Sequence, residues 1–204
     1  MFQFRRKPDL KKLLERKDVQ GLVQALQRAS DDARTEIAQI LVDMRDPRAT
    51  EALLREAESA DMSVRRIAAQ AINRIDPEHK YVAAVHMLND VHRNVRTAAI
   101  GILASLGNPK ALDALITTLK KERDPQARAA AATAIGTLKD RRGLQPLLDA
   151  IDDGDERVRI AAVDSLAVLG DRTALDTIIR MHETDEHPDG RQAAERAIAK
   201  LQRG

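Results

Sequence analysis

Six arginines recur along the chain at steps of 31 or 32 residues: Arg34, Arg65, Arg96, Arg128, Arg159 and Arg191. Guanidinium groups at regular spacing can track phosphates, because arginine binds phosphate in a bidentate geometry. The same arginines could instead form a structural ladder, in which each bonds to acids or carbonyls of adjoining repeats. Because the column runs in step with the apolar residues of every repeat, we predict the structural role.

Histidine and acidic residues gather in residues 182–187 (HETDEH), which could collect a metal ion. His182, however, falls in a column that is otherwise apolar, which favours a packing position. His86 and His92 flank a predicted loop without carboxylates at ligand spacing. The chain has no cysteine, which excludes a disulfide, a Cys-based zinc site and a cysteine nucleophile. Since a glycine-rich phosphate loop and a Ser-His-Asp arrangement are also absent from the sequence, we predict no catalytic residue, no metal site and no cofactor.

An internal repeat places these residues on helices. The fragments SVRRIAAQAI, NVRTAAIGIL, QARAAAATAI and RVRIAAVDSL are versions of one unit. Apolar residues after each arginine, such as Leu103 and Leu106, form one stripe of an amphipathic helix, which we call the A helix. A second apolar column, 13 residues after Leu103 in the case of Ile116, defines the B helix. Its members are Val23, Leu54, Val85, Ile116, Leu148 and Ile179.

Capping residues agree with these helices. Asp61, Asp124 and Asp155 stand four residues before an arginine of the column, where they can cap A helices. Caps for the B helices are predicted at Asp46, Asp76, Asn108, Asp140 and Asp171. Mostly basic residues lie near the starts of the B helices, where an anion could bind, although solvated surface positions explain them as well. They are Lys17, Arg48, His79, Lys110, Arg142 and Thr173.

The unit D-x-x-V-R-x-A-A-x-x-A-L-x-x-L-G-D-x-x-A-L-x-x-L-I, clearest over Asp155–Ile179, resembles the short HEAT-like repeat of phycobilin lyase subunits. It is also similar to the units of small archaeal HEAT-repeat proteins. The resemblance covers about Asp18–Leu201 and implies stacked αα-hairpins, with a tetrapyrrole-handling lyase subunit as one function. Deoxyhypusine hydroxylase is a HEAT-repeat enzyme whose iron lies between several His-Glu pairs. This chain has one such pair, His182–Glu183, which argues against that ligand set.

We therefore predict an all-α fold, a right-handed α-solenoid of about six HEAT-like αα-hairpin repeats in a single domain of residues 1–204. Residues 1–17 would form an N-terminal cap with a short helix, residues 18–188 the repeats, and residues 189–204 a C-terminal capping helix. Close approach of neighbouring helices is expected at Ala68, Ala99, Ala131 and Ala162.

The charge and the composition limit the kinds of partner that the chain is expected to bind. The 34 Lys and Arg nearly balance the 32 Asp and Glu, and the only aromatic residues are Phe2, Phe4 and Tyr81. Nucleic-acid surfaces need excess positive charge and rings on which bases stack, so the composition argues against DNA or RNA. The first residues lack the apolar stretch of a signal peptide, and no window approaches the ~18 apolar residues of a membrane span. We expect a soluble, cytoplasmic protein.

The expected function is a non-catalytic scaffold that binds a protein partner on the concave surface of its B helices. The expected partner-binding residues are Arg55, Val82, His86, Met87, Asp113, Thr117, Asp149 and Arg180. Val82, His86 and Met87 would form an apolar centre with a charged rim, as interfaces often have, although packing drift in one repeat explains the same residues. The alternative is an accessory subunit of a lyase or cofactor-loading enzyme of the phycobilin-lyase type. A third alternative is a scaffold without a defined ligand, natural or engineered.

Overall fold

The computed structural model describes residues 10–203 apart from residues 58, 73, 76 and 92, and it describes residues 62, 65, 66, 69 and 94 by their backbone only. The A helices are α3 (Asp31–Asp43), α5 (Met62–Ile72), α7 (Arg93–Leu106), α9 (Pro125–Leu138), α11 (Glu156–Leu169) and α13 (Pro188–Arg203). The B helices are α2 (Val19–Arg28), α4 (Pro47–Glu56), α6 (Pro77–Met87), α8 (Ala111–Lys121), α10 (Leu144–Ala150) and α12 (Leu175–Thr184). The order is completed by α1 (Leu10–Glu15) and by the 3-10 turns η1 (Arg141–Gly143) and η2 (Arg172–Ala174).

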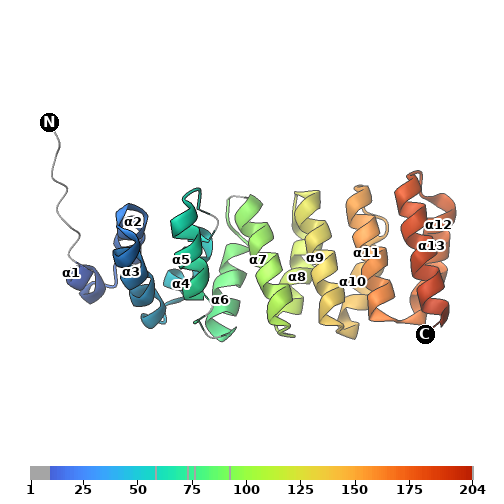
Figure 1. Ribbon diagram of the computed structural model, residues 1–204. Coiled ribbons are helices and arrows are strands. Elements are labelled where there is room, and N and C mark those ends of the chain that lie inside the picture. The colour runs from blue at the N-terminus through green and yellow to red at the C-terminus, as the bar shows by residue number, and fades with distance from the viewer. Residues whose placement is uncertain (1–9, 58, 73, 76, 92, 204) are drawn as a thin grey trace. The chain divides into compact units, whose positions relative to one another are not determined.

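Helices of the two kinds alternate along the chain, and the described residues contain no strand, which confirms the predicted all-α solenoid. The chain divides into two compact units, Met1–Ala83 and Ala84–Gly204. In the first unit α3 packs against α2 and α5, and in the second α9 packs against α7, α8 and α11 (Figure 1). The single domain of residues 1–204 stays a prediction. No helix within the described ranges is long and apolar enough to span a membrane.

The predicted caps form where the structure describes them. Asp124 accepts a hydrogen bond from the Gln126 N–H at 2.9 Å, and Asp155 accepts one from the Arg157 N–H at 3.0 Å. Each described cap of a B helix accepts from the N–H two residues further on, namely Asp46, Asn108, Asp140 and Asp171. Asp76, predicted as a cap, lies outside the described residues. These bonds fix where helices begin, because they satisfy N–H groups that the first turn leaves free.

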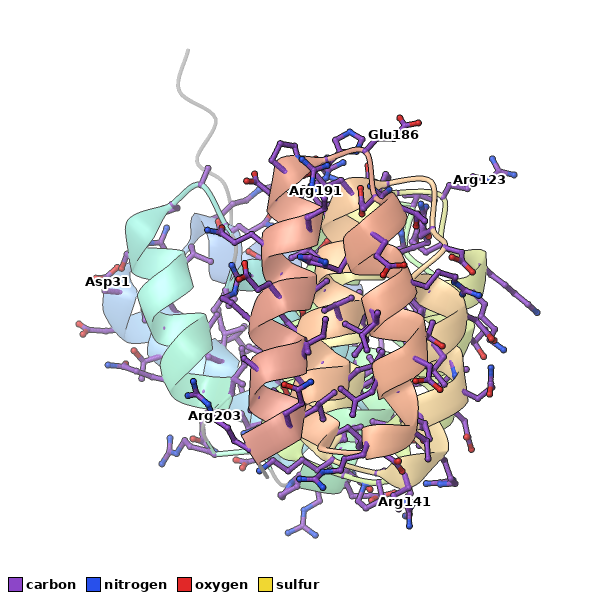
Figure 2. All side chains as sticks on the ribbon, turned by 90° about the vertical axis from the view of Figure 1, so that its right-hand side faces the viewer. Asp31, Arg123, Arg141, Glu186, Arg191 and Arg203 are labelled. Atoms are coloured by element: carbon purple, nitrogen blue, oxygen red, sulfur yellow. The ribbon has the colours of Figure 1, made fainter. Side chains whose placement is uncertain are left out.

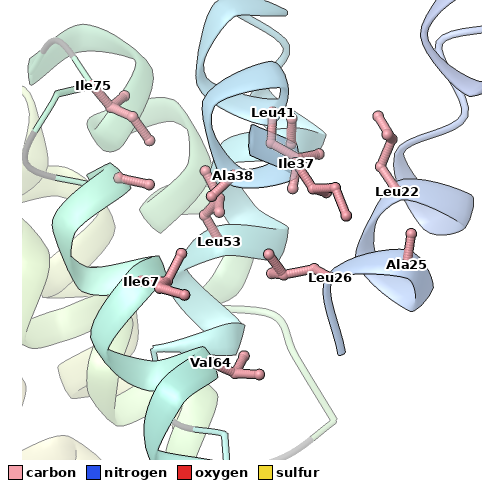
Figure 3. Close-up of a cluster of buried hydrophobic side chains, with 12 residues drawn as sticks. Leu22, Ala25, Leu26, Ile37, Ala38, Leu41, Leu53, Val64, Ile67 and Ile75 are labelled. Atoms are coloured by element: carbon pink, nitrogen blue, oxygen red, sulfur yellow. The ribbon is translucent and has the colours of Figure 1, made fainter. Parts of the chain in front are cut away.

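The core of the first unit is a cluster of aliphatic side chains from successive helices. Leu22 and Leu26 of α2 lie with Leu41 of α3, Leu53 of α4 and Ile67 of α5 (Figure 3). All five side chains are buried. A core without large rings lets the helices of adjacent hairpins approach closely.

The four alanines at which neighbouring helices were predicted to approach closely lie in the core. Ala68, Ala99, Ala131 and Ala162 are all fully buried. Nearby, α9 and α11 approach closely at Gly136, because a Cβ atom on this glycine would lie 2.6 Å from Cβ of Ser165. The buried Ser165 hydroxyl donates a hydrogen bond to the Ala132 carbonyl at 2.9 Å. Small residues therefore set the spacing of the A helices.

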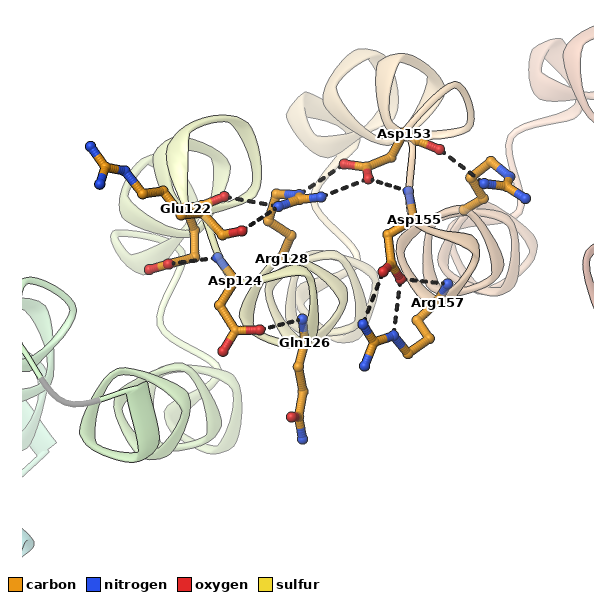
Figure 4. A network of polar contacts seen from close by, with 9 residues as sticks. Glu122, Asp124, Gln126, Arg128, Asp153, Asp155 and Arg157 are labelled. Carbon is orange, nitrogen blue, oxygen red and sulfur yellow. Dashed lines mark hydrogen bonds and ion pairs between the residues drawn. The ribbon is translucent and has the colours of Figure 1, made fainter.

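The arginine column lies at the start of the A helices and forms the predicted structural ladder. Arg128 donates to both carboxylate oxygens of Asp153, at 2.9 and 2.8 Å, and to the backbone carbonyls of Glu122 and Arg123 (Figure 4). Glu122 and Arg123 follow α8 of the preceding hairpin, whereas Asp153 follows α10 of the same hairpin as Arg128. One guanidinium thus joins an A helix to the ends of the two B helices beside it.

The same connection recurs along the second unit. Arg96 donates to both carboxylate oxygens of Glu122 at 2.7 and 3.0 Å, and Arg159 to both of Asp185 at 2.9 and 2.8 Å. Arg191 donates to the Asp185 carbonyl at 2.7 Å. We call each arginine with its carboxylate and carbonyl partners an arginine staple. The staples leave these guanidiniums engaged within the protein, as the structural ladder requires.

The first unit has a more open version of the staple. Arg34 donates to the Leu26 and Gln27 carbonyls, and it reaches Asp61 with a single contact of 2.9 Å. The Asp61 side chain is 47% exposed, whereas that of Asp185 is 2% exposed. Arg65 belongs to the residues that the structure describes by their backbone only. Water competes more effectively for the staple of Arg34.

The staples shift the acidity of their carboxyl groups. Hydrogen bonds from Arg159 lower the pKa of Asp185 to about 2, against an opposing effect of burial. Hydrogen bonds from Arg96 likewise hold the pKa of Glu122 below its ordinary value. Burial acts to raise the pKa of Asp153, but its bonds to Arg128 and to the Asp155 N–H outweigh burial and lower it. All three groups are therefore ionised at neutral pH.

We predict that Ala131→Leu lowers the free energy of unfolding by about 1–3 kcal/mol, because the larger side chain must push the helices apart. The matched control is Thr133→Leu, two residues along α9, where the side chain is exposed. Urea denaturation monitored by circular dichroism measures both. Equal effects of the two substitutions would contradict the assignment of the buried face.

A second prediction concerns acid. Because the pKa of Asp185 is depressed in the folded state, its contribution is present above the unfolded value near 4 and is lost as the pH falls toward 2. We expect wild type to exceed Asp185→Asn in unfolding free energy by about 2 kcal/mol at pH 5. The difference should shrink steadily between pH 5 and pH 2 in urea denaturations at each pH. A difference that does not change over this range would contradict the proposed ionisation.

Candidate partner-binding surface

Most residues of the predicted surface lie exposed on the B helices. In the first unit Arg55 of α4 is exposed and pairs with Glu51 at 2.7 Å, while Val82 of α6 is half-buried. The second unit exposes the remaining polar residues of the predicted set: His86, Asp113, Thr117, Asp149 and Arg180. The structure therefore leaves these side chains available to solvent within their own units. That they bind a partner stays a prediction.

Met87 was wrongly placed on this surface. Its side chain is 1% exposed and belongs to the core. Met87 stands three residues after Ala84, which is also buried, and residues three apart share a face of a helix. The inward column to which Met87 belongs is buried in every repeat: Ala25, Glu56, Met87, Thr118, Ala150 and Met181.

Two polar members of this inward column disguised it in the sequence. Glu56 accepts a hydrogen bond from the Gln27 amide at 2.8 Å, and the Thr118 hydroxyl donates to the Ala114 carbonyl at 3.0 Å. These bonds let polar side chains occupy positions that the other repeats fill with alanine or methionine. An apolar patch of Val82, His86 and Met87 is therefore not formed.

The second unit instead carries partly exposed apolar residues on each of its later B helices. Ile116 and Leu148 are half-buried, and Ile179 is 37% exposed. They belong to one column of the repeat and stand beside the charged and polar column of Thr117, Asp149 and Arg180. This face of α8, α10 and α12 thus combines apolar area with charge.

Ion pairs across this face are long. Lys120 lies 3.7 Å from Asp149, Arg180 lies 3.9 Å from Asp152, and Arg142 lies 3.8 Å from Asp113. Between exposed side chains, pairs of this kind contribute little to stability. Their groups remain able to exchange partners, in contrast to the carboxylates of the arginine staples.

Two hollows open at the carboxyl-terminal ends of the B helices in the second unit. The first, of about 510 Å³, is lined among others by Leu119, Pro146, Asp149, Ala150 and Asp152. The second, of about 330 Å³, lies one repeat further on and includes Ile151, Asp152, Arg180, Met181 and Glu186. Figure 2 shows Arg123 and Glu186 at this end of the second unit and Arg141 at the opposite end.

The other candidate sites of the sequence do not assemble. Where the structure describes the chain, no group of three or more His, Asp or Glu residues could hold a metal ion, and His182 is half-buried on α12. Among the basic residues near the starts of the B helices, Arg48 and Arg142 pair with the capping residues Asp46 and Asp140, each at 2.7 Å. These two arginines thus reinforce helix caps.

Sequence reasoning missed the staple carboxylates and the hollows. Glu122, Asp153 and Asp185 each stand six residues before an arginine of the column, so their spacing carried a signal that could have been found. The hollows left no such signal, because they form between residues of two consecutive repeats and a loop.

Comparison with known proteins agrees with this architecture. Residues 112–199 match the family model of HEAT repeats, and residues 95–121 match that of the PBS lyase HEAT-like repeat. Phycocyanobilin lyase subunit alpha of Picosynechococcus sp. is 36% identical over 75 residues, which are 34% of this chain and 28% of that protein. The chain thus matches little more than a quarter of its curated relative.

A solved structure extends the likeness in fold. Human deoxyhypusine hydroxylase in complex with glycerol is similar with a TM-score of 0.52, over 91% of this chain and 85% of that one. At 18% identity this likeness concerns the fold alone. The repeating hairpins and the matched family models lead to one conclusion: residues 95–199 of the chain consist of HEAT-like repeats, and residues 95–121 among them are similar to the repeat of the PBS lyase family.

Proposed function

We propose that this protein is a non-catalytic scaffold that binds a protein partner on the exposed face of its B helices. The observation that carries the proposal is a contrast between two columns of the repeat. The arginine column has the same residue in every repeat, and the five side chains described there bond within the protein. The exposed B-helix column changes its residue from each repeat to the next: Gln24, Arg55, His86, Thr117, Asp149 and Arg180.

The contrast supports the recognition of a partner. The fold requires that the residues of its internal contacts repeat, but it does not require any particular residue at an exposed position. An exposed position that changes from amide to cation to carboxylate presents a pattern that one partner can match along several repeats. In the second unit, Leu148 and Ile179 supply apolar area beside the charges, and interfaces gain much of their energy from such area. The long ion pairs of Asp149 and Asp152 leave both groups free to meet a partner.

A second candidate function is favoured by the lyase relative. Its similarity over 75 residues supports an accessory subunit of a phycobilin lyase, in which this chain would help to handle the tetrapyrrole. The two functions differ in an observable property. An accessory subunit that holds the pigment should change the visible absorption of added phycocyanobilin and retain pigment through gel filtration. A scaffold without a pigment site should elute free of it and leave the spectrum unchanged.

The scaffold proposal predicts where a partner touches the chain. A photo-crosslinking amino acid at Thr117 should give a discrete adduct with a partner from the native host, identified by mass spectrometry. The matched control is Thr133 on α9, since both threonines are exposed and each donates its hydroxyl to the carbonyl four residues earlier. The two positions therefore differ in the helix that carries them and not in local structure.

An adduct from Thr117 and none from Thr133 is the expected result. Adducts of equal yield at both positions, or an adduct at Thr133 alone, would contradict binding by the B helices. Circular dichroism of both variants checks that the helices are intact, so a missing adduct does not reflect unfolding.

A further inference from the structure

The two hollows of the second unit occupy equivalent places in successive repeats. Leu119 of the first hollow corresponds to Ile151 of the second, and Ala150 corresponds to Met181. Each hollow also reaches an arginine staple, Arg128 in the first and Arg159 in the second. The apolar wall and the staple are therefore shared features, which belong to the repeat.

The hollows differ in the charge of one key position. Asp149 lines the first hollow, and Arg180 stands at the equivalent position of the second. In the first hollow, Asp149 joins Asp152, and their side chains are 50% and 74% exposed. The Asp153 carboxylate there is already occupied by Arg128. The charge that a ligand would meet comes from Asp149 and Asp152, opposed by Lys120 beside the first and by Arg180 beside the second.

The contacts of these two carboxylates leave room for a further cation. Asp149 accepts a hydrogen bond from the Gln145 amide at 2.8 Å, and Lys120 stays 3.7 Å away. Asp152 has Arg180 at 3.9 Å. Both ion pairs are longer than a hydrogen bond, so neither carboxylate is saturated. The carboxyl-terminal end of α10 adds the negative end of its helix dipole.

We propose that the first hollow binds an arginine or lysine side chain of the partner protein, an inference that rests on the proposed scaffold function. Such side chains have an apolar stem and a charged head. The stem would lie against Pro146 and Ala150, and the head would lie between Asp149 and Asp152. The second hollow should bind a cation less tightly than the first, because Arg180 replaces the aspartate there, although Asp152 and Glu186 also line it.

Short peptides test this assignment on the full chain. Three twelve-residue Gly/Ser peptides, with blocked ends and a central arginine, norleucine or glutamate, are titrated into the labelled protein, and backbone amide shifts are followed by NMR. The arginine peptide should shift the amides of residues 149–153 and bind about tenfold more tightly than the glutamate peptide, since it gains two charge contacts. The norleucine peptide, which keeps the apolar stem without the charge, should bind more weakly than the arginine peptide.

Exchanging the key residue provides the sharpest control. Asp149→Arg gives the first hollow the charge of the second and should abolish the shifts, whereas Asp164→Arg, an equal change at an exposed position of α11, should leave them unchanged. Unaltered binding by Asp149→Arg, or equal binding of arginine and glutamate peptides, would overturn the assignment. If the Thr117 adduct still forms while the arginine peptide fails, only the hollow is misassigned. An adduct at Thr133 alone would instead contradict the proposed binding of a partner by the B helices.

Discussion

The arginine staple is the interaction on which the rest of the second unit depends. A packed stack of hairpins buries apolar side chains between helices, but hydrophobic contact has no direction and does not by itself fix how one hairpin turns against the next. Arg128 supplies that direction, because its planar guanidinium bonds at once to the carboxylate of Asp153 and to carbonyls that end α8. Repetition of the staple at Arg96 and Arg159 carries the same geometry from hairpin to hairpin.

The staple also determines which surfaces remain for function. A guanidinium that bonds to the ends of two helices is not free to bind phosphate. The arginine column is the most regular set of positive charges in the sequence, and it is therefore not available to a ligand. Asp185 shows the reciprocal effect, since Arg159 keeps it ionised and occupied in the interior. Recognition is left to side chains without internal partners of this strength, and these include Asp149 on α10 and Asp152 just after it.

Much of the fold was predictable because the repeat displays each structural role several times, between three and six. The columns of arginine, alanine and capping aspartate identified the helices, their ends and their buried faces. Met87 was misplaced because Glu56 and Thr118, in the same column, are buried with internal hydrogen bonds that composition does not reveal. The hollow at Asp149 was missed because it depends on how α8, α10 and the following loop come together. A column of equivalent residues in the sequence does not show this arrangement.

A double-mutant cycle on Arg128 and Asp153 tests the central role of the staple most directly. Unfolding free energies are measured in urea for wild type, Arg128→Met, Asp153→Asn and the double variant, with the more exposed pair Arg142 and Asp140 as reference. If the staple holds the hairpins together, Arg128 and Asp153 should be coupled by about 2 kcal/mol, and the reference pair by less than about 1 kcal/mol. Additive effects of Arg128→Met and Asp153→Asn would contradict the account.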